Sequence, residues 1–358
     1  MKPTLQTVAD VVGVSRSTVS NAYSRPARLS RELRDKSFDA AKKLGYAGPH
    51  AAARSLRRGR AGAIGVLFTD SLSYAFVDPY AVRFLRGLSE SAERHDTGLL
   101  LLPLSFGDRA EAERKVREAV VDGFCVYCVP EWHVAMSAVK SRGLPIVTTE
   151  YRKDAEPTES FVGVDDYAAA FSAASHVARL GHRRFAVLSV MPEYREGFAR
   201  SGPHEVGAIE SITDVEMRER LLGFRDALAK AGVEWEDVTV TNAVTNSRAA
   251  GNVAASYVLD QADRPTAVLA GTDLLALGTL DAAASRGLRA GRDVSVTGFD
   301  DIPDAKTAGL TTVRQPAIDK GVIAGELLLD PPDEVSQRQV LLPTELIVRA
   351  STGPIERR

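Results

Sequence analysis

From residue 63 onward the chain alternates short apolar runs with longer amphipathic stretches, and this alternation constrains the possible folds more than any other feature. Short runs rich in Val, Ile and Leu are typical of buried strands, and the stretches between them have helical spacing. The pattern predicts parallel sheets covered by helices on both faces. The expected strands lie at 64–68, 98–102, 123–129, 145–149, 161–165, 184–190, 238–240, 267–270 and 295–299. The expected helices lie at 82–94, 109–121, 134–141, 168–180, 218–231, 248–260 and 274–286.

The strands form two series, and the second series is expected to begin near residue 161. Two such series predict two doubly wound lobes within one body. Ligands of open α/β sheets bind in crevices outside the carboxyl ends of the strands. A small-molecule cleft is therefore predicted between the lobes.

The first 46 residues have a different pattern. Apolar positions over 5–12 share one helical face, and Gly13 then allows a tight turn. Ser15 is a good N-cap for a second helix over 16–24, and a third helix is expected over 31–44. Two short helices joined by a glycine turn predict a helix-turn-helix domain. The second helix directs polar side chains outward that suit bases and phosphates, namely Arg16, Ser17, Thr18, Ser20 and Asn21.

Charge is divided unevenly along the chain. Residues 1–60 contain thirteen Lys or Arg and four Asp or Glu, a net charge of +9, whereas the remainder has 32 basic and 43 acidic residues, a net charge of −11. A basic head on an acidic body indicates a polyanionic partner for the head. The linker 47–61 contains four arginines but is too short for a stable isolated helix, so it is expected to fold only against DNA.

Several motifs resemble the lactose-repressor (LacI-type) family of transcription regulators. They are the opening Thr4–Asn21, the later Leu44-Gly45-Tyr46, and in the body Gly163-Val164-Asp165, Leu180-Gly181-His182-Arg183-Arg184, Asp293–Asp301 and Leu310–Pro316. The resemblance covers nearly the whole chain. It implies an N-terminal all-α helix-turn-helix domain and an α/β periplasmic-binding-protein-like body of two doubly wound parallel-sheet lobes.

The resemblance also implies domain boundaries. Residues 1–46 are expected to form the helix-turn-helix domain, 47–61 a hinge helix, and 62–358 the effector-binding and dimerisation domain. The family's chain crosses between its lobes three times, and the crossings are expected near 162, 313 and 330. The first lobe would then comprise 62–162 and 314–329, and the second lobe 163–313 and 330–358.

By the same resemblance, the bases are read by Arg16, Ser17 and Asn21. The phosphate-contacting positions are Thr4, Ser15, Thr18, Ser20 and Ser24, and Arg28 joins the DNA-facing set. In the hinge, Ala53 and Leu56 match minor-groove positions, where a leucine wedge kinks DNA. Paired hinges on a palindromic operator require a homodimer. The tail after residue 350 has no heptad repeat, so no tail-mediated tetramer is expected.

Effector contacts are also assigned by resemblance. Glu150, Arg220 and Asp300 match ligand-contacting positions, and Thr272 stands where several sugar-binding members have Asn. Three aromatic residues are candidates for stacking on a ring: Tyr74, Phe76 and Tyr127. Carboxylates and a guanidinium suit hydroxyl-rich ligands, so a sugar or nucleoside effector is predicted. Alternatively, Arg220 and Asp300 form an interlobe ion pair, and the aromatic side chains only pack.

Other classes of function fit less well. A sugar-binding transport protein would share the body but carry a signal peptide and no DNA-binding head; the start of this chain has no signal-like apolar core, and no run is long enough to span a membrane. A cytoplasmic repressor without a membrane partner is expected. An enzyme is disfavoured, because the sequence has no phosphate loop, serine elbow or metal cluster.

The pair Cys125 and Cys128 is interpreted as two small residues of a buried strand, so neither a metal nor a cofactor is predicted. A regulator whose cleft binds no small molecule, or binds a phosphoprotein, remains an alternative.

Overall fold

The computed structural model describes residues 3–48, 60–68, 72–104, 108–130, 133–153, 155–190, 204–206, 208–243 and 245–355. The chain divides into two compact units, the head Met1–Gly62 and the body Ala63–Arg358. The predicted hinge residues Ala53 and Leu56 lie outside the described residues.

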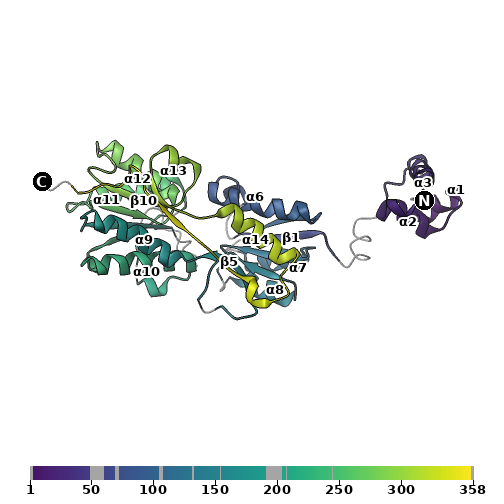
Figure 1. Ribbon diagram of the computed structural model, residues 1–358, viewed down its shortest axis with the longest axis horizontal. Helices are drawn as coiled ribbons and strands as arrows, with labels where there is room; N and C mark the ends of the chain where they lie inside the picture. Colours follow the sequence, from purple (N-terminus) through teal and green to yellow (C-terminus); the bar gives the residue numbers. More distant parts are fainter. Residues whose placement is uncertain are drawn as a thin grey trace. The chain divides into compact units, whose positions relative to one another are not determined.

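The head is helical, as predicted (Figure 1). Its elements are α1 (Leu5–Val12), α2 (Arg16–Ser24), the 3₁₀ turn η1 (Pro26–Arg28) and α3 (Arg31–Leu44). Apolar side chains spaced three and four apart on these helices form its core, which comprises Leu5, Val8, Ala9, Val19, Ala40 and Ala41. The helix-turn-helix arrangement is therefore confirmed.

The first lobe of the body is built on a parallel sheet with the strand order β12-β5-β4-β3-β1-β2. Its strands are β1 (Ala63–Phe68), β2 (Gly98–Pro103), β3 (Gly123–Tyr127), β4 (Ile146–Thr148), β5 (Ser160–Val164) and β12 (Gln339–Leu342). Its helices are α5 (Leu72–Ala75), α6 (Pro79–Arg94), α7 (Arg109–Glu118), α8 (Val134–Ser141), α14 (Ala317–Leu329) and the 3₁₀ turn η4 (Val335–Arg338).

The second lobe has the strand order β13-β11-β10-β9-β6-β8-β7, parallel except for its two edge strands. Its strands are β6 (Phe185–Val190), β7 (His204–Glu205), β8 (Thr239–Ala243), β9 (Ala267–Ala270), β10 (Ser295–Asp300), β11 (Thr311–Arg314) and β13 (Glu345–Ile347). Its helices are α9 (Asp166–Arg179), α10 (Val215–Lys230), α11 (Arg248–Leu259), α12 (Asp273–Ser285) and α13 (Pro303–Thr307), with turns η2 (Ile209–Ser211) and η3 (Trp235–Asp237).

Alternate residues of the strands face different layers of helices. In β1, Ile64, Val66 and Phe68 join the apolar cluster of α6 and α14, whereas Leu67 joins that of α7 and α8. This is the period-two alternation expected of a strand buried on both faces. Helices α6 and α14 approach closely, because Gly87 and Gly321 leave room where any Cβ atom would overlap backbone of the facing helix. The predicted doubly wound sheets are thus confirmed.

The chain passes between the lobes at three points of its described part, and one prediction of these points is wrong. Strand β5 belongs to the first sheet, so the first crossing follows Val164, and the second follows Arg314. The third crossing was expected near 330, but β12 pairs with β5 in the first sheet. It therefore lies at 343–344, and the segment 330–342 belongs to the first lobe. Pairing between strands so distant in sequence has no local signal.

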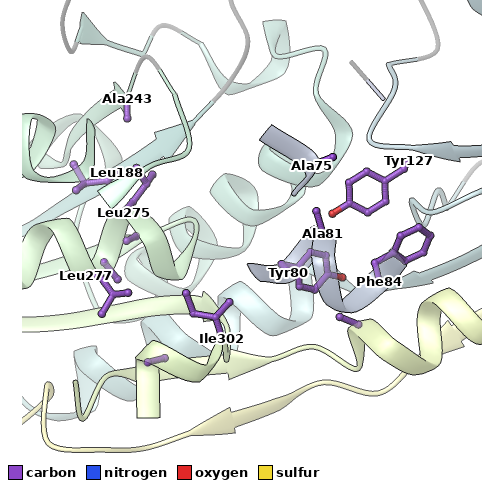
Figure 2. Close-up of a cluster of buried hydrophobic side chains, with 14 of the residues drawn as sticks. Ala75, Tyr80, Ala81, Phe84, Tyr127, Leu188, Ala243, Leu275, Leu277 and Ile302 are labelled. Atoms are coloured by element: carbon purple, nitrogen blue, oxygen red, sulfur yellow. The ribbon is translucent and has the colours of Figure 1, made fainter. Parts of the chain in front are cut away.

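A single buried apolar cluster extends from the first lobe into the second. Figure 2 shows Tyr80, Phe84 and Tyr127 gathered in the first lobe, with Leu188, Leu275 and Ile302 continuing the cluster into the second. The two lobes are therefore packed against each other near the crossings, which brings the carboxyl ends of both sheets together.

Candidate functional site

The position of α2 in the head is fixed by the turn before it. Gly13 ends α1 with a φ of 76°, in the left-handed region that favours glycine. Ser15 caps α2, because its Oγ accepts a hydrogen bond from the backbone N–H of Thr18 at 3.1 Å. Val19 and Ala22 are buried in the head. The opposite side of α2 is therefore directed outward.

That outward side holds the residues predicted to read bases and contact phosphates. It comprises exposed Arg16 and Ser17, and half-buried Thr18, Ser20 and Asn21. The hydroxyl of Ser24 donates to the carbonyl oxygen of Ser20 at 2.9 Å. Thr4 caps α1, and Arg28 is exposed at the end of η1. A short helix with an outward polar face and a guanidinium in its first turn has the shape that major-groove recognition requires.

In the body, Arg220 of α10 is buried and is held by hydrogen bonds from Nε and Nη1. Its Nε donates to Asp166 Oδ1 at 2.8 Å, its Nη1 donates to the carbonyl oxygen of Gly271 at 2.8 Å, and its guanidinium carbon lies 3.9 Å from the centroid of the Phe299 ring. The alternative of an interlobe ion pair between Arg220 and Asp300 is therefore wrong: among the described residues, the carboxylates within 4.0 Å of the guanidinium belong to Asp166 and Glu216, in the same lobe.

Asp300 ends β10 with a φ of 125°, a backbone conformation that side chains rarely adopt. Gln315 Nε2 donates to Asp300 Oδ1 at 2.7 Å, and the Tyr80 hydroxyl donates to Gln315 Oε1 at 3.0 Å. A chain of hydrogen bonds therefore links the lobes through Gln315 at the second crossing. Burial raises the pKa of Asp300 well above its usual value, and the charge of Arg220 opposes that shift.

Glu150 follows β4 and is half-buried at the side of the cleft. Its pKa is raised well above the usual value by burial and by the charges of Glu216 and Asp214. Glu150 also borders a cavity of 1150 Å³, whose lining includes Tyr151 and Phe161 of the first lobe and Val215 of α10. The predicted effector residues Arg220, Thr272 and Asp300 do not line this cavity. Space beside a carboxyl group at the carboxyl end of a strand suits a bound ligand.

Thr272 and its neighbour Asp273 have different surroundings. The Thr272 hydroxyl donates to Asn246 Oδ1 at 2.7 Å and caps α12. Asp273 accepts hydrogen bonds from the Ile302 backbone N–H at 2.8 Å and the Thr312 hydroxyl at 2.5 Å. Asp273 therefore holds α12 against β10 and β11, which is a structural role.

The three aromatic candidates are not brought together. The Tyr74 hydroxyl donates to Asp78 Oδ2 at 3.1 Å. Phe76 is 60% exposed. Tyr127 is buried, and its ring centroid lies 4.7 Å from that of Phe84 and 5.3 Å from that of Phe68 (Figure 2). Of the three, Tyr127 thus serves the core of the first lobe.

Three charged residues of the ion-pair network around Arg220 were not predicted: Asp166, Glu216 and Lys320. Lys320 of α14 is 2% exposed, and its Nζ lies 3.7 Å from Glu216 Oε1 of the other lobe. The sequence did contain signals for them. Glu216 stands one helical turn before Arg220 on the same face of α10, and Lys320 is the only basic residue of the apolar helix α14.

Other kinds of site find little support in the described part of the chain. No cluster of three or more His, Cys, Asp or Glu there is arranged to hold a metal ion. Cys125 and Cys128 are not joined by a disulfide; Cys125 is buried in β3, and the Cys128 thiol donates to Glu216 Oε2 at 3.7 Å. No helix among the described residues is long and apolar enough to cross a membrane.

Comparison with known proteins gives this geometry its context. Residues 4–48 match the family model of bacterial regulatory proteins of the lacI family, and residues 174–352 match that of a periplasmic binding protein-like domain. An HTH-type transcriptional regulator of Mycolicibacterium smegmatis is 38% identical over 356 residues, which cover 99% of this chain and 97% of that protein. The chain belongs to the lacI family. It is an HTH-type transcriptional regulator.

Solved structures agree with this LacI-family assignment. A LacI-family transcriptional regulator from Corynebacterium glutamicum is 33% identical with a TM-score of 0.73, covering 98% of this chain and 99% of its own. A lac repressor dimer bound to operator and the anti-inducer ONPF has a TM-score of 0.76 at 22% identity, with coverages of 98% and 99%. A CelR–cellobiose complex has a TM-score of 0.68 at 24% identity, with the same coverages. The last two share the fold.

Proposed function

We propose that this LacI-family regulator binds a palindromic operator as a homodimer and represses transcription until a small hydroxyl-rich effector, a sugar or nucleoside, enters the interlobe cleft. The DNA-binding residues would be those of α2 together with the hinge residues Ala53 and Leu56, and the effector contacts would centre on Glu150, Arg220, Thr272 and Asp300. Such a regulator would act in the cytoplasm, where bacterial DNA is found.

The observation that carries the DNA-binding part is the outward polar face of α2. Arg16 is exposed in the first turn, and Asn21 lies one turn and a half further along the same helix. The net charge of +9 over residues 1–60 favours association with phosphates. The lac repressor that shares this fold was solved as a dimer on its operator, which supports the same mode of binding here.

The effector part is supported by the polar groups at the carboxyl ends of the strands. Asp300 ends β10 of the second lobe, and Glu150 follows β4 of the first lobe. Both side chains have oxygen atoms that can accept hydrogen bonds from ligand hydroxyl groups. The CelR complex with cellobiose is a precedent for a sugar in this fold. A ligand touching both lobes would change their relative orientation, and a change of that kind alters how two paired heads meet an operator.

Selection of bound sites from a random DNA pool tests the proposal. The full-length protein is used, first alone and then with each member of a panel of sugars and nucleosides. The expected result is enrichment of one palindromic site, with enrichment lost in the presence of one compound. Failure to enrich any site, under every condition, would refute specific DNA binding.

The same experiment distinguishes this proposal from a second candidate function, that of a regulator without a small-molecule effector. A palindrome that is enriched equally with every compound would support that candidate. The Thr272 hydroxyl favours this second candidate, because its proton is donated to Asn246 Oδ1 at 2.7 Å.

A further inference from the structure

The connection between β4 and β5 leaves one face of the first sheet incompletely covered. Parallel neighbours such as these two strands are usually joined by a helix that packs on the sheet. Here they are joined by segment 149–159, whose described residues form no helix. Val147 of β4 packs in the cluster of α14, so the adjacent Ile146 faces the opposite side of the sheet. Ile146 is only half-buried, although β4 is an inner strand of that sheet.

The connection is held to the sheet at both of its ends. A Cβ atom at Gly163 of β5 would lie 2.6 Å from the backbone nitrogen of Tyr151, so the connection lies directly against the strand there. Near the other end, Gln339 Nε2 of β12 donates to the carbonyl oxygens of Glu156 at 2.8 Å and Glu159 at 3.1 Å. The cavity that the connection borders therefore has a wall fixed to the sheet.

This cavity, which has a volume of 1150 Å³, is lined by residues of both lobes. Its apolar lining comprises Met136, Ile146 and Phe161 of the first lobe and Ile212 and Val215 of the second. Small-molecule sites enclose about 300–1,000 Å³, so the space is sufficient for a ligand. On the other face of the sheets, the apolar cluster that includes α6 and α12 fills the junction of the lobes. The lobes are thus packed together on one flank and leave a cavity on the other.

Charged side chains of both signs line the cavity, and several of them have partners within the protein. Lys153 Nζ of the first lobe lies 3.4 Å from Glu219 Oε2 of the second lobe, and Arg218 Nε lies 3.9 Å from Glu219 Oε1. Glu210 Oε1 lies 3.1 Å from Arg225 Nη1. A charged ligand would compete with these contacts, whereas an uncharged ligand can occupy the apolar space and leave them in place.

We propose that this cavity is a second ligand site, separate from the interlobe cleft, for an uncharged and mainly apolar ring compound. The rings of Tyr151 and Phe161 both line it, with centroids 5.7 Å apart, and aromatic rings favour a flat partner. The flexible thioether of Met136 adapts to ligands of irregular shape. Burial of apolar ligand surface supplies the binding energy.

The two sites are distinct in their residues. Arg220, Thr272 and Asp300, which are proposed to contact the effector, do not line the cavity, whereas Glu150 borders it. Because both lobes contribute walls, the contacts of a ligand in the cavity depend on the angle between the lobes. Such a ligand favours one orientation, and the coupling between the two sites is reciprocal. This coupling rests on the proposed function, but occupancy of the cavity does not.

Fluorescence titration of the full-length protein with Nile red, an uncharged polycyclic dye that emits strongly in apolar surroundings, tests the inference. The expected result is a saturable rise in emission. Ile146→Phe and Thr148→Phe place larger side chains in the cavity and should each weaken dye binding by about tenfold or more. Two such variants are used so that a folding defect in one leaves the other informative, and the melting temperature of each is recorded.

The control is Leu341→Phe, in the neighbouring strand β12. Leu341 pairs with Gly163, is 49% exposed and does not line the cavity, so this variant should bind the dye as the wild type does. The absence of saturable binding would overturn the inference, and so would unchanged affinity in both cavity-filling variants. Loss of dye binding in Asp300→Asn alone would place the dye in the interlobe cleft and would also overturn it. These readouts use neither DNA nor an effector, so their failure leaves the proposed function standing.

Discussion

In the head, the side chains proposed to read DNA come from nine consecutive residues, Arg16–Ser24, whereas the cleft of the body is assembled from separate segments between Tyr80 and Lys320. The head residues are held by their own helix, its cap and a small apolar core. The cleft residues hold one another, through buried ion pairs and hydrogen bonds that cross between elements.

This difference has an energetic consequence. A substitution on the outer face of α2 removes a contact to a partner and leaves the fold intact. A substitution in the cleft removes the partner of a buried charge, and an unpaired buried charge destabilises the fold itself. Recognition and stability are thus separable in the head and coupled in the body.

The largest expected effect is that of Arg220→Met. It leaves the Asp166 carboxylate buried without its 2.8 Å partner, which should lower the free energy of unfolding of the body by about 3–5 kcal/mol. Hydrogen exchange, followed separately in head and body peptides, measures the effect. Arg225→Met on the same helix is the control, since its partners Glu210 and Asp226 lie near the surface. Equal losses from both variants would contradict the coupling described for the cleft.

Arg16→Ala should weaken DNA recognition and leave the stability of the fold unchanged. We expect no change in melting temperature, but a loss of about 1–3 kcal/mol for the preferred base at one position of each half-site. Binding to operators with each base substituted in turn provides the measurement. Arg31→Ala, at a position of α3 where the side chain is 89% exposed, is the comparison variant. A loss that is uniform over all bases would identify Arg16 as a phosphate contact instead.

The sequence was sufficient where contacts are local. The helix at 134–141 has the predicted bounds, and Ser15 and the turn at Gly13 are placed as the spacing indicated. The sequence was insufficient where the contacting residues are far apart along the chain. The pairing of β12 with β5 joins residues about 180 positions apart. The ion-pair partner that the sequence analysis considered for Arg220, as an alternative to ligand contact, was Asp300 rather than Asp166. Lys320 was overlooked because its counter-charge lies on another lobe.

Titration should distinguish the two regions further. Burial and the charge of Glu216 raise the pKa of Asp214 to about 6, against an unfolded value of about 3.9. Between these values the folded body holds the proton and the unfolded chain does not, so its free energy of unfolding falls as the pH rises from about 4 to about 6. The hydrogen bond from the Met217 N–H and the neighbouring charges of Arg220 and Arg218 oppose this rise in the pKa of Asp214.

Asp214→Asn should remove part of this dependence, on the order of 1–2 kcal/mol across that range. Asn keeps the N-cap of α10, whose hydrogen bond from the Met217 N–H is 2.8 Å long. Thermal unfolding of the body at a series of pH values provides the measurement. A variant with the same slope as the wild type would mean that Asp214 is ionised throughout.

The smallest effect is expected for Ser15→Ala. Loss of the cap of α2 should destabilise the head by about 1 kcal/mol and leave the body unchanged. Ser15→Asn, which can still cap the helix, should restore most of that stability. Hydrogen exchange of head amides distinguishes the two variants, and a comparable loss in the body would show that the regions are not independent.

The three crossings between the lobes are neighbours in space. The end of β5 lies beside the end of β12, since Val164 pairs with Leu342, and the end of β11 lies beside the start of β13, since Arg314 pairs with Glu345. The three short segments that connect the lobes lie side by side. They restrict translation of one lobe relative to the other far more than they restrict rotation of one lobe about the line through the segments. The body is thus built as a one-axis joint. A rearrangement of the lobes by the proposed effector would then be described by a single angle between them.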